Sequence, residues 1–389
     1  MTLPKAYMTK IKTITAVSKA TDPFIVSQEL FQQLNQDKID FVLFYCSSTY
    51  PLKDLAKSMS ATFHSIDIVG CTTAGEVTNQ GYEQHSVVAI GFSSDYFAIS
   101  ATLIESLEKF DTINAQSTIN ELIERCQSKH LTTIKTNSFL LTLLDGLSSS
   151  EEQFLVTLDS AARGIPHFGG AAGDDVSLAK THVYYHGNFY QNAAIVIMIN
   201  TILPFEVFNC NHVEHPTEKL VVTAANADTR TVYELNAEPA ALEYAKLLQM
   251  DLKDLSPEVF SLNPLAVKVG GHYYIRSIQK VNEADLSLTF YCAVDVGIVL
   301  TAVEMGDIFD PVIQNLESIA ERFGEPEMVL TCDCFLRRLE IEQKGLESKV
   351  TELNTLYNIV GFNTYGEHIN GIHLNQTFTG VYIAGNPNE

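Results

Sequence analysis

The sequence is poor in basic residues and lacks tryptophan. Its 389 residues include 25 lysines and arginines against 47 aspartates and glutamates, which gives a formal charge of −22. A surface of this charge repels phosphate backbones and anionic lipid headgroups. We therefore expect no nucleic-acid partner and no binding to a membrane surface.

Long apolar runs and a regular cysteine pattern are also missing. No apolar run reaches the roughly 18–20 residues that span a bilayer, so we expect no membrane insertion. Residues 1–23 lack the apolar block of a signal peptide. The seven cysteines are an odd number with irregular spacing, so we expect no disulfide framework, and a reducing cytoplasm is the simplest location.

Signatures of catalysis are missing as well. Ser148 follows Gly146 at the spacing of a nucleophile elbow, but the second glycine of that motif is absent. The glycine-rich residues 169–173 lack the lysine of a P-loop and the helix context of a dinucleotide fingerprint. An enzyme on this scaffold remains a third hypothesis, but we expect that the chain is not an enzyme.

What the chain does contain is a repeated motif. Residues 68–77 read IVGCTTAGEV and residues 359–368 read IVGFNTYGEH. Both contain Ile-Val-Gly-x-x-Thr-x-Gly-Glu, and the glycine before the acid suits a positive φ or a close backbone approach. Each copy follows a predicted strand and a predicted helix, at residues 41–48 and 52–63 for the first copy and 328–338 and 339–357 for the second.

A looser third copy lies between these two. Residues 138–146 are predicted as a strand, and Ser148 and Glu151 form a predicted capping box for the next helix. Residues 166–175 are predicted as a glycine-rich turn, whose Ala-Gly-Asp string corresponds to Ala-Gly-Glu at residues 74–76. The motif is thus predicted to be the corner of one recurring structural unit.

These units predict an α/β fold in which repeated strand–helix–strand units form two linked domains with mixed sheets. Apolar residues make up 46% of the chain, which provides for a large core. Residues 203–215 resemble a crossing between domains, and Pro216 follows them. We expect a first domain at residues 1–215, with two internal half-repeats, and a second at 216–389.

The motifs resemble those of the FIST family of bacterial sensory proteins. The stretches that carry the resemblance are VGCTTAGE at 69–76, DGLSSSEEQFL through FGGAAGDD at 145–175, KLVVTAA through EYAKLL at 219–248, and GFNTYGEH through HLNQTFTG at 361–380. The resemblance implies an N-terminal FIST domain, a C-terminal FIST-C domain and the sensing of a small ligand, for which amino acids are candidates.

The chain is also similar to the haem-binding, nitric-oxide-sensing NosP subfamily. It has no fused kinase, cyclase or methyl-acceptor region, and residues 208–223 form a histidine-bearing crossing segment. This similarity implies a b-type haem, nitric oxide as the ligand and a separate partner, such as a histidine kinase or a cyclic-di-GMP pathway protein. A homodimer is a further expectation.

The predicted iron ligands are His212 and His215. They lie three residues apart in a predicted loop or strand end, and the alternative is that both are solvated surface histidines. A zinc site is less suited to the sequence. Cys332 and Cys334 alternate on a predicted strand, so their side chains are expected on opposite faces, as one core residue and one pocket or surface residue.

A second set of polar residues surrounds the C-terminal copy of the motif. A guanidinium, a carboxylate and neutral hydrogen-bonding groups there suit the carboxylate and ammonium of an amino acid. The alternative is a structural salt bridge at a sheet end. The predicted ligand-binding residues of this haem-free amino-acid sensor are Arg337, Tyr365, Glu367, His373, Asn375 and Thr377.

Overall fold

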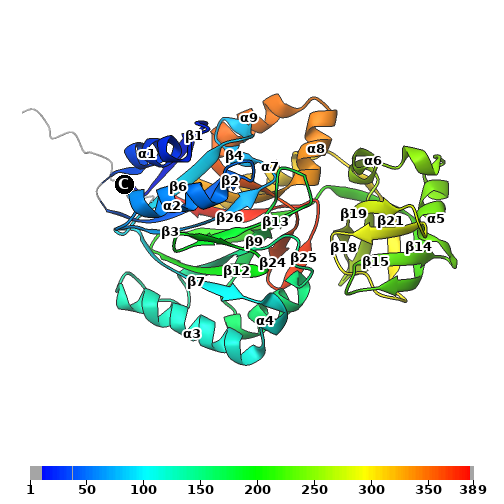
Figure 1. Ribbon diagram of the computed structural model, residues 1–389, viewed down its shortest axis with the longest axis horizontal. Coiled ribbons are helices and arrows are strands. Elements are labelled where there is room, and N and C mark those ends of the chain that lie inside the picture. Colours follow the sequence, from blue (N-terminus) through cyan, green and yellow to red (C-terminus); the bar gives the residue numbers. More distant parts are fainter. Residues whose placement is uncertain (1–10, 37, 386–389) are drawn as a thin grey trace, which may run out of the picture.

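The computed structural model describes residues 11–36 and 38–385. Figure 1 shows a large α/β body and a smaller, mainly β unit that projects from one side of it. The body contains three six-stranded sheets, and the smaller unit contains one eight-stranded sheet. The predicted class, an α/β protein with mixed sheets and repeated units, is confirmed.

The body consists of three copies of one unit, each an outer strand, a helix, a strand, one or two helices, a strand, a hairpin and a closing strand. The first copy is β1 (Thr13–Ser18), α1 (Pro23–Leu34), β2 (Ile39–Ser47), α2 (Leu52–Thr62), β3 (Asp67–Thr73), β4 (Glu76–Thr78), β5 (Gly81–Glu83) and β6 (Val87–Ser93).

The second copy has the same order of elements. It comprises β7 (Phe97–Glu105), a 3₁₀ turn (Leu107–Lys109), α3 (Thr112–Ser128), β8 (Ser138–Leu144), α4 (Glu151–Ala162), β9 (His167–Ala171), β10 (Val183–Tyr185), β11 (Asn188–Tyr190) and β12 (Ala193–Thr201).

The third copy is interrupted after its outer strand, where the smaller unit is inserted. It comprises β13 (Phe205–Cys210), α7 (Asp310–Phe323), β22 (Pro326–Cys334), α8 (Phe335–Gln343), α9 (Glu347–Tyr357), β23 (Ile359–Thr364), β24 (Glu367–Ile369), β25 (Ile372–Leu374) and β26 (Phe378–Ala384).

The smaller unit, which we call the inserted unit, runs from β14 to β21. It comprises β14 (Val213–Asn226), β15 (Thr231–Leu235), β16 (Glu238–Pro239), α5 (Ala240–Leu247), a 3₁₀ turn (Leu252–Asp254), α6 (Pro257–Leu262), β17 (Leu265–Val269), β18 (His272–Arg276), β19 (Ile278–Asn282), β20 (Ser287–Phe290) and β21 (Val299–Met305).

The three copies exchange their hairpins. The hairpin β4–β5 of the first copy pairs with β23 of the third, and β10–β11 of the second pairs with β3 of the first. The hairpin β24–β25 of the third copy pairs with β9 of the second. Each sheet of the body therefore contains strands from two copies, and the exchange closes in a ring.

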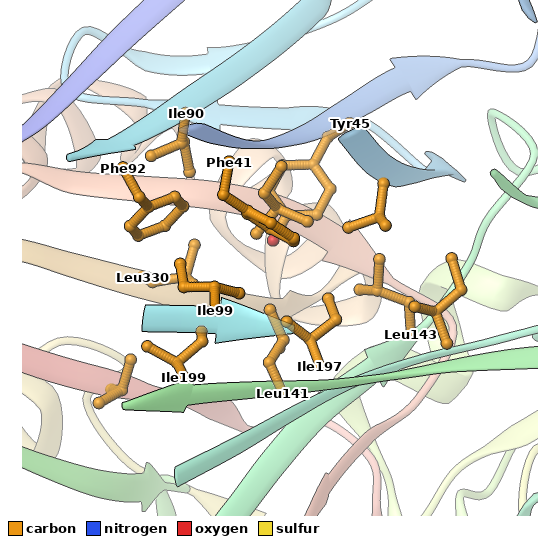
Figure 2. Packing of buried hydrophobic residues seen from close by; sticks show 14 of the residues in the cluster. Phe41, Tyr45, Ile90, Phe92, Ile99, Leu141, Leu143, Ile197, Ile199 and Leu330 are labelled. Carbon is orange, nitrogen blue, oxygen red and sulfur yellow. The ribbon is translucent and has the colours of Figure 1, made fainter. Parts of the chain in front are cut away.

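The inner faces of the three sheets share one core. Figure 2 shows Phe41 and Tyr45 of β2 facing Ile197 of β12 and Leu141 of β8, with Leu330 of β22 alongside. The helices cover the outer faces, so central strands such as β8 and β12 are buried at every position. This explains why their sequences are continuous apolar runs and not alternating patterns.

The repeated motif forms the corners of the three copies, and the corner backbones bond to one another. Three such bonds link the copies in a ring: Ala74 N–H to the Asn363 carbonyl (3.0 Å), Tyr365 N–H to the Ala171 carbonyl (3.2 Å), and Gly173 N–H to the Thr72 carbonyl (3.1 Å). The motif therefore has a structural role at the corners of the fold, as its repetition predicted.

Four local predictions were wrong. The strand predicted at 328–338 ends at Cys334, and α8 begins at Phe335. The helix predicted at 339–357 is two helices, because Gly345 has a φ of 64° and ends the first. The turn predicted at 166–175 begins only after β9. The capping box fails because α4 starts at Glu151 after Ser150, whose side chain makes no capping bond; Ser148 Oγ instead accepts from Ser150 N–H at 3.3 Å.

The predicted division at 215/216 falls inside β14. After the inserted unit, the chain returns to the body, where β22 and β13 both pair with β26. Cys332 and Cys334 face opposite sides of β22, as predicted, but both are core residues, because each packs in a different buried apolar cluster.

Candidate functional site

The junction between the inserted unit and the body holds a buried cluster of ionisable side chains. Glu151 and Glu152 lie in the first turn of α4 in the body. Arg230, from the turn before β15, donates from Nη2 to both carboxylates, at 2.7 Å to Glu152 Oε2. This contact joins the two parts of the molecule through Arg230 and Glu151, which are almost fully withdrawn from water, and Glu152, whose side chain is 30% exposed.

On the other side of Glu152 lie a histidine and a cysteine. His373 Nδ1 is 3.0 Å from Glu152 Oε1 and 3.6 Å from Cys292 Sγ. Asn375 Oδ1 is 3.0 Å from the same sulfur and accepts from Ser277 N–H at 3.1 Å. The inserted unit supplies Cys292 and Ser277, and the body supplies the other three residues.

The pKa values in this cluster follow from burial and from the neighbouring charges. Burial alone would lower the pKa of His373, but Cys292 and Glu152 raise it to about 10. Burial alone would raise the pKa of Glu152, but His373 and Arg230 hold it well below its usual range. Glu152 and His373 therefore form a charged pair at neutral pH.

A cleft of about 740 Å³ opens beside this cluster in the inserted unit. Valines and isoleucines form much of its wall, and three basic side chains come from β14, β17 and β18. Its lining residues are Lys219, Ala227, Val267, Lys268, Val269, Tyr273, Arg276, Ala293, Val294, Asp295, Gly297, Ile298, Val299 and Thr301.

One segment of this lining also contacts the body. Residues 293–299 form one side of the cleft, and Ala293 donates its N–H to Glu152 Oε1 at 2.8 Å. Anything that shifts this segment therefore acts directly on a carboxylate of the body. The cleft and the buried cluster together make the junction our candidate functional site.

The residues predicted around the C-terminal motif are only partly brought together. Glu367 accepts from the Thr364 hydroxyl and from Thr377 N–H at 3.1 Å, inside one corner. Tyr365 donates its hydroxyl to Asp174 of another corner. His373 and Asn375, by contrast, do reach the junction, where both approach Cys292.

Arg337 lies in a different buried network. Its Nε donates to Asp333 Oδ1 at 2.9 Å, and its Nη1 is 3.4 Å from His212 Nδ1. Its guanidinium also lies over the Phe378 ring, 5.8 Å from the centroid. The structure thus pairs Arg337 with Asp333, at the end of β22, and not with Glu367.

The two predicted iron ligands lie in different surroundings. His212 is buried, and its Nε2 is 2.8 Å from Glu340 Oε2, which leaves neither ring nitrogen open to a metal. His215 is mostly exposed and lies beside Glu214, with its Nε2 at 3.4 Å from Oε1. Neither histidine lines the cleft, and iron ligation by either residue stays a prediction.

Sequence reasoning missed Arg230, Glu151, Glu152 and Cys292 as site residues. Arg230, Glu151 and Glu152 are charged residues in stretches without a site motif. The only signal in the sequence was the pair of adjacent acids, Glu151 and Glu152, at the start of a helix. Cys292 stands alone in a β-rich stretch, about 80 residues from His373. No spacing rule links residues that an insertion brings together.

The fold and the junction define an α/β protein of repeated units with an inserted β unit, whose cleft lies beside its junction with the body. The FIST N domain matches residues 40–238, and the FIST C domain matches residues 240–370. The chain therefore belongs to the FIST family, whose domains are associated with sensing in signal transduction.

No curated protein is significantly similar to this chain. Among the described residues, no helix is long and apolar enough to cross a membrane.

Proposed function

We propose that this chain is a haem-free sensory protein that binds a small amphipathic carboxylate in the cleft of the inserted unit. The observation that carries the proposal is the double role of Ala293, which lines the cleft and donates to Glu152 of the body. Occupancy of the cleft acts on the segment 293–299 and hence on the junction. A separate signalling protein then binds the body differently in its altered conformation.

The chemistry of the cleft supports this ligand class. Its volume of about 740 Å³ lies within the roughly 300–1,000 Å³ of small-molecule sites. Lys219, Lys268 and Arg276 supply positive charge in a chain of formal charge −22, and a guanidinium binds a carboxylate through two parallel hydrogen bonds. Asp295 is the acidic residue among the lining residues and suits an ammonium group, so an amino acid with an apolar side chain belongs to this class.

An effector must favour one conformation through its own binding energy. Here the ligand bridges strands β17 and β18 to the segment 293–299, so it stabilises the arrangement in which these elements are close. The expected change is local, at the root of the segment where Ala293 meets Glu152.

The experiment is titration calorimetry with apolar amino acids and with the matching carboxylates that lack the ammonium group. Arg276→Gln should weaken binding by about 10-fold or more, because a hydrogen bond to a charged group contributes roughly 1.5–3 kcal/mol. Lys253→Gln is the matched control, since Lys253 belongs to the same unit but is exposed and paired with Asp251. If no carboxylate binds the wild type, or if both variants bind alike, the proposal is wrong.

Haem-based nitric-oxide sensing in a bacterial cytoplasm, with signalling to a histidine kinase or a cyclic-di-GMP pathway, is a separate proposal that rests on the resemblance of residues 208–223. An absorption spectrum after haem is supplied tests it. A Soret band that is lost in His212→Ala or His215→Ala would support it, and the absence of any band would exclude it.

A further inference from the structure

We propose that Glu152, Cys292 and His373 form a binding site for a zinc-like transition-metal ion that joins the inserted unit to the body. A carboxylate oxygen, a sulfur and an imidazole nitrogen are the donor types that zinc(II) takes in proteins. The three donor atoms lie within 4.8 Å of one another. The site lies beside the cleft but shares none of its lining residues.

One of the donor distances matches a tetrahedral ion. With a zinc–sulfur bond of about 2.3 Å and a zinc–nitrogen bond of about 2.0–2.1 Å, the two donors lie about 3.6 Å apart at the tetrahedral angle. The distance from Cys292 Sγ to His373 Nδ1 is 3.6 Å. The distance from Nδ1 to Glu152 Oε1 is 3.0 Å, and it needs to lengthen by about 0.4 Å for the same geometry.

The surroundings of the three donors fit a metal centre. Asn375 Oδ1, 3.0 Å from the sulfur, is placed to complete the coordination or to hold a water that does so. Arg230 holds the other oxygen of Glu152, at 2.7 Å, which fixes the orientation of the carboxylate. Cys292 and His373 are 1% and 6% exposed.

The charges balance when the ion binds. The Cys292 thiol and the His373 imidazolium each release a proton to solvent, and the sulfur and Nδ1 then donate lone pairs to the metal. Two positive charges of the ion and one of Arg230 then face the negative charges of Glu151, Glu152 and the thiolate. The junction is thus electrically neutral with the metal in place, as it is without the metal, where Arg230 and the His373 imidazolium face Glu151 and Glu152. Metal binding therefore leaves no uncompensated charge in the junction.

Cobalt(II) titration of the metal-free full chain tests the proposal. The wild type should bind one equivalent and show a thiolate-to-cobalt charge-transfer band in the near ultraviolet. Cys292→Ser should remove the band and weaken binding at least about 10–100-fold, the effect of losing even an outer partner of a metal ligand. Cys126→Ser, at another buried cysteine, is the matched control and should keep both.

A measurement on the wild type alone guards against variants that do not fold. Zinc(II) without other ligands should raise the melting temperature, because an ion that binds only the folded chain stabilises it by mass action. No thiolate band in the wild type, or equal affinities for Cys292→Ser and Cys126→Ser, would show that cobalt binds only to surface carboxylates and would overturn the proposal.

Discussion

Glu76 and Glu367 occupy equivalent corners of two repeats and are both fully buried. Glu76 accepts from the Thr73 and Ser86 hydroxyls, each at 2.6 Å, and Glu367 makes the matching bonds in its own corner. Burial raises the pKa of each carboxyl to about 7, although the neighbouring hydroxyls favour the charged form. Each corner is therefore sensitive to pH near neutrality.

The direction of this pH dependence follows from the raised pKa. A carboxyl whose folded pKa of about 7 exceeds its unfolded value of about 4.3 contributes stability below the unfolded value, and that contribution is lost as the pH rises through about 7. Glu367→Gln keeps the shape and removes the titration. The free energy of unfolding of this variant, relative to wild type, should therefore increase from about pH 5 to about pH 8, by about 1.4 kcal/mol per unit of pKa difference.

Denaturant titrations at several pH values measure this effect. Glu283→Gln, at an exposed turn between β19 and β20, is the control and should follow the wild type at every pH. A difference between Glu367→Gln and wild type that does not change with pH would contradict the expectation.

At the scale of elements, one exchanged hairpin is held by side chains from a helix of the copy that receives it. Helix α9 of the third copy binds the turn of β4–β5 from the first copy. Asn354 Nδ2 donates to the Thr78 carbonyl at 2.9 Å, and Thr355 Oγ1 donates to the Asn79 carbonyl at 2.8 Å. The turn of this hairpin is thus held to α9 by hydrogen bonds from polar side chains.

Asn354→Ala should loosen this hairpin. Asn354 is 2% exposed, and its removal leaves a buried carbonyl without its donor, which costs about 1–3 kcal/mol. Amide exchange should speed up across residues 76–83, and the unfolding midpoint should fall. Leu356→Ala is the control, because Leu356 lies on the same helix and is 68% exposed; equal exchange in the two variants would exclude a special role for the amide.

The sequence predicted elements far better than it predicted their partners. Runs such as residues 138–144 are apolar enough to read as buried strands, and the repeated motif marked the corners correctly. The pairing of β4 with β23 joins residues almost 300 positions apart, and no local pattern encodes it. The helix break at Gly345 was missed because charged residues on both sides continue a helical pattern.

At the scale of the candidate site the limit is similar. His373 and Asn375 were predicted as ligand-binding residues because they flank the repeated motif. Both lie at the junction beside Cys292, and ligand binding by them stays a prediction. Arg230 and Cys292 were not recognised, because the inserted unit brings them there from stretches without any motif. Arg337 was predicted to lie with Glu367, but its partner is Asp333, four residues earlier in the chain.

The whole molecule depends on how the inserted unit is attached to the body. In Figure 1 this unit projects from one side, and the chain enters and leaves it beside β13 and α7. The charged residues at the junction, from Arg230 to His373, join the two parts, together with buried contacts such as that of Gln376 Nε2 with the Ser261 carbonyl at 2.7 Å. Because His373 has a pKa raised to about 10 by Cys292 and Glu152, its charged pairing with Glu152 is present at neutral pH and is lost as the pH rises through about 10.

Arg230→Gln should loosen the attachment of the inserted unit to the body. Glu151, whose pKa is already raised by burial, would lose its cation, and breaking a buried pair in this way costs about 3–5 kcal/mol. Amide exchange should increase at residues 227–235 and 291–298 and should change little in β8 and β12. The loss should shrink at acidic pH, because Glu151 becomes neutral there and no longer needs the cation.

Arg322→Gln is the matched control for this change. Arg322 binds Glu206 through two hydrogen bonds, at 2.5 and 2.8 Å, but on the surface, where such a pair contributes only about 0–1 kcal/mol. Exchange and denaturation measured on both variants then compare two arginine–carboxylate pairs that differ chiefly in burial. If Arg230→Gln costs no more than Arg322→Gln, or if exchange rises evenly through the body, the junction ions do not hold the inserted unit in place.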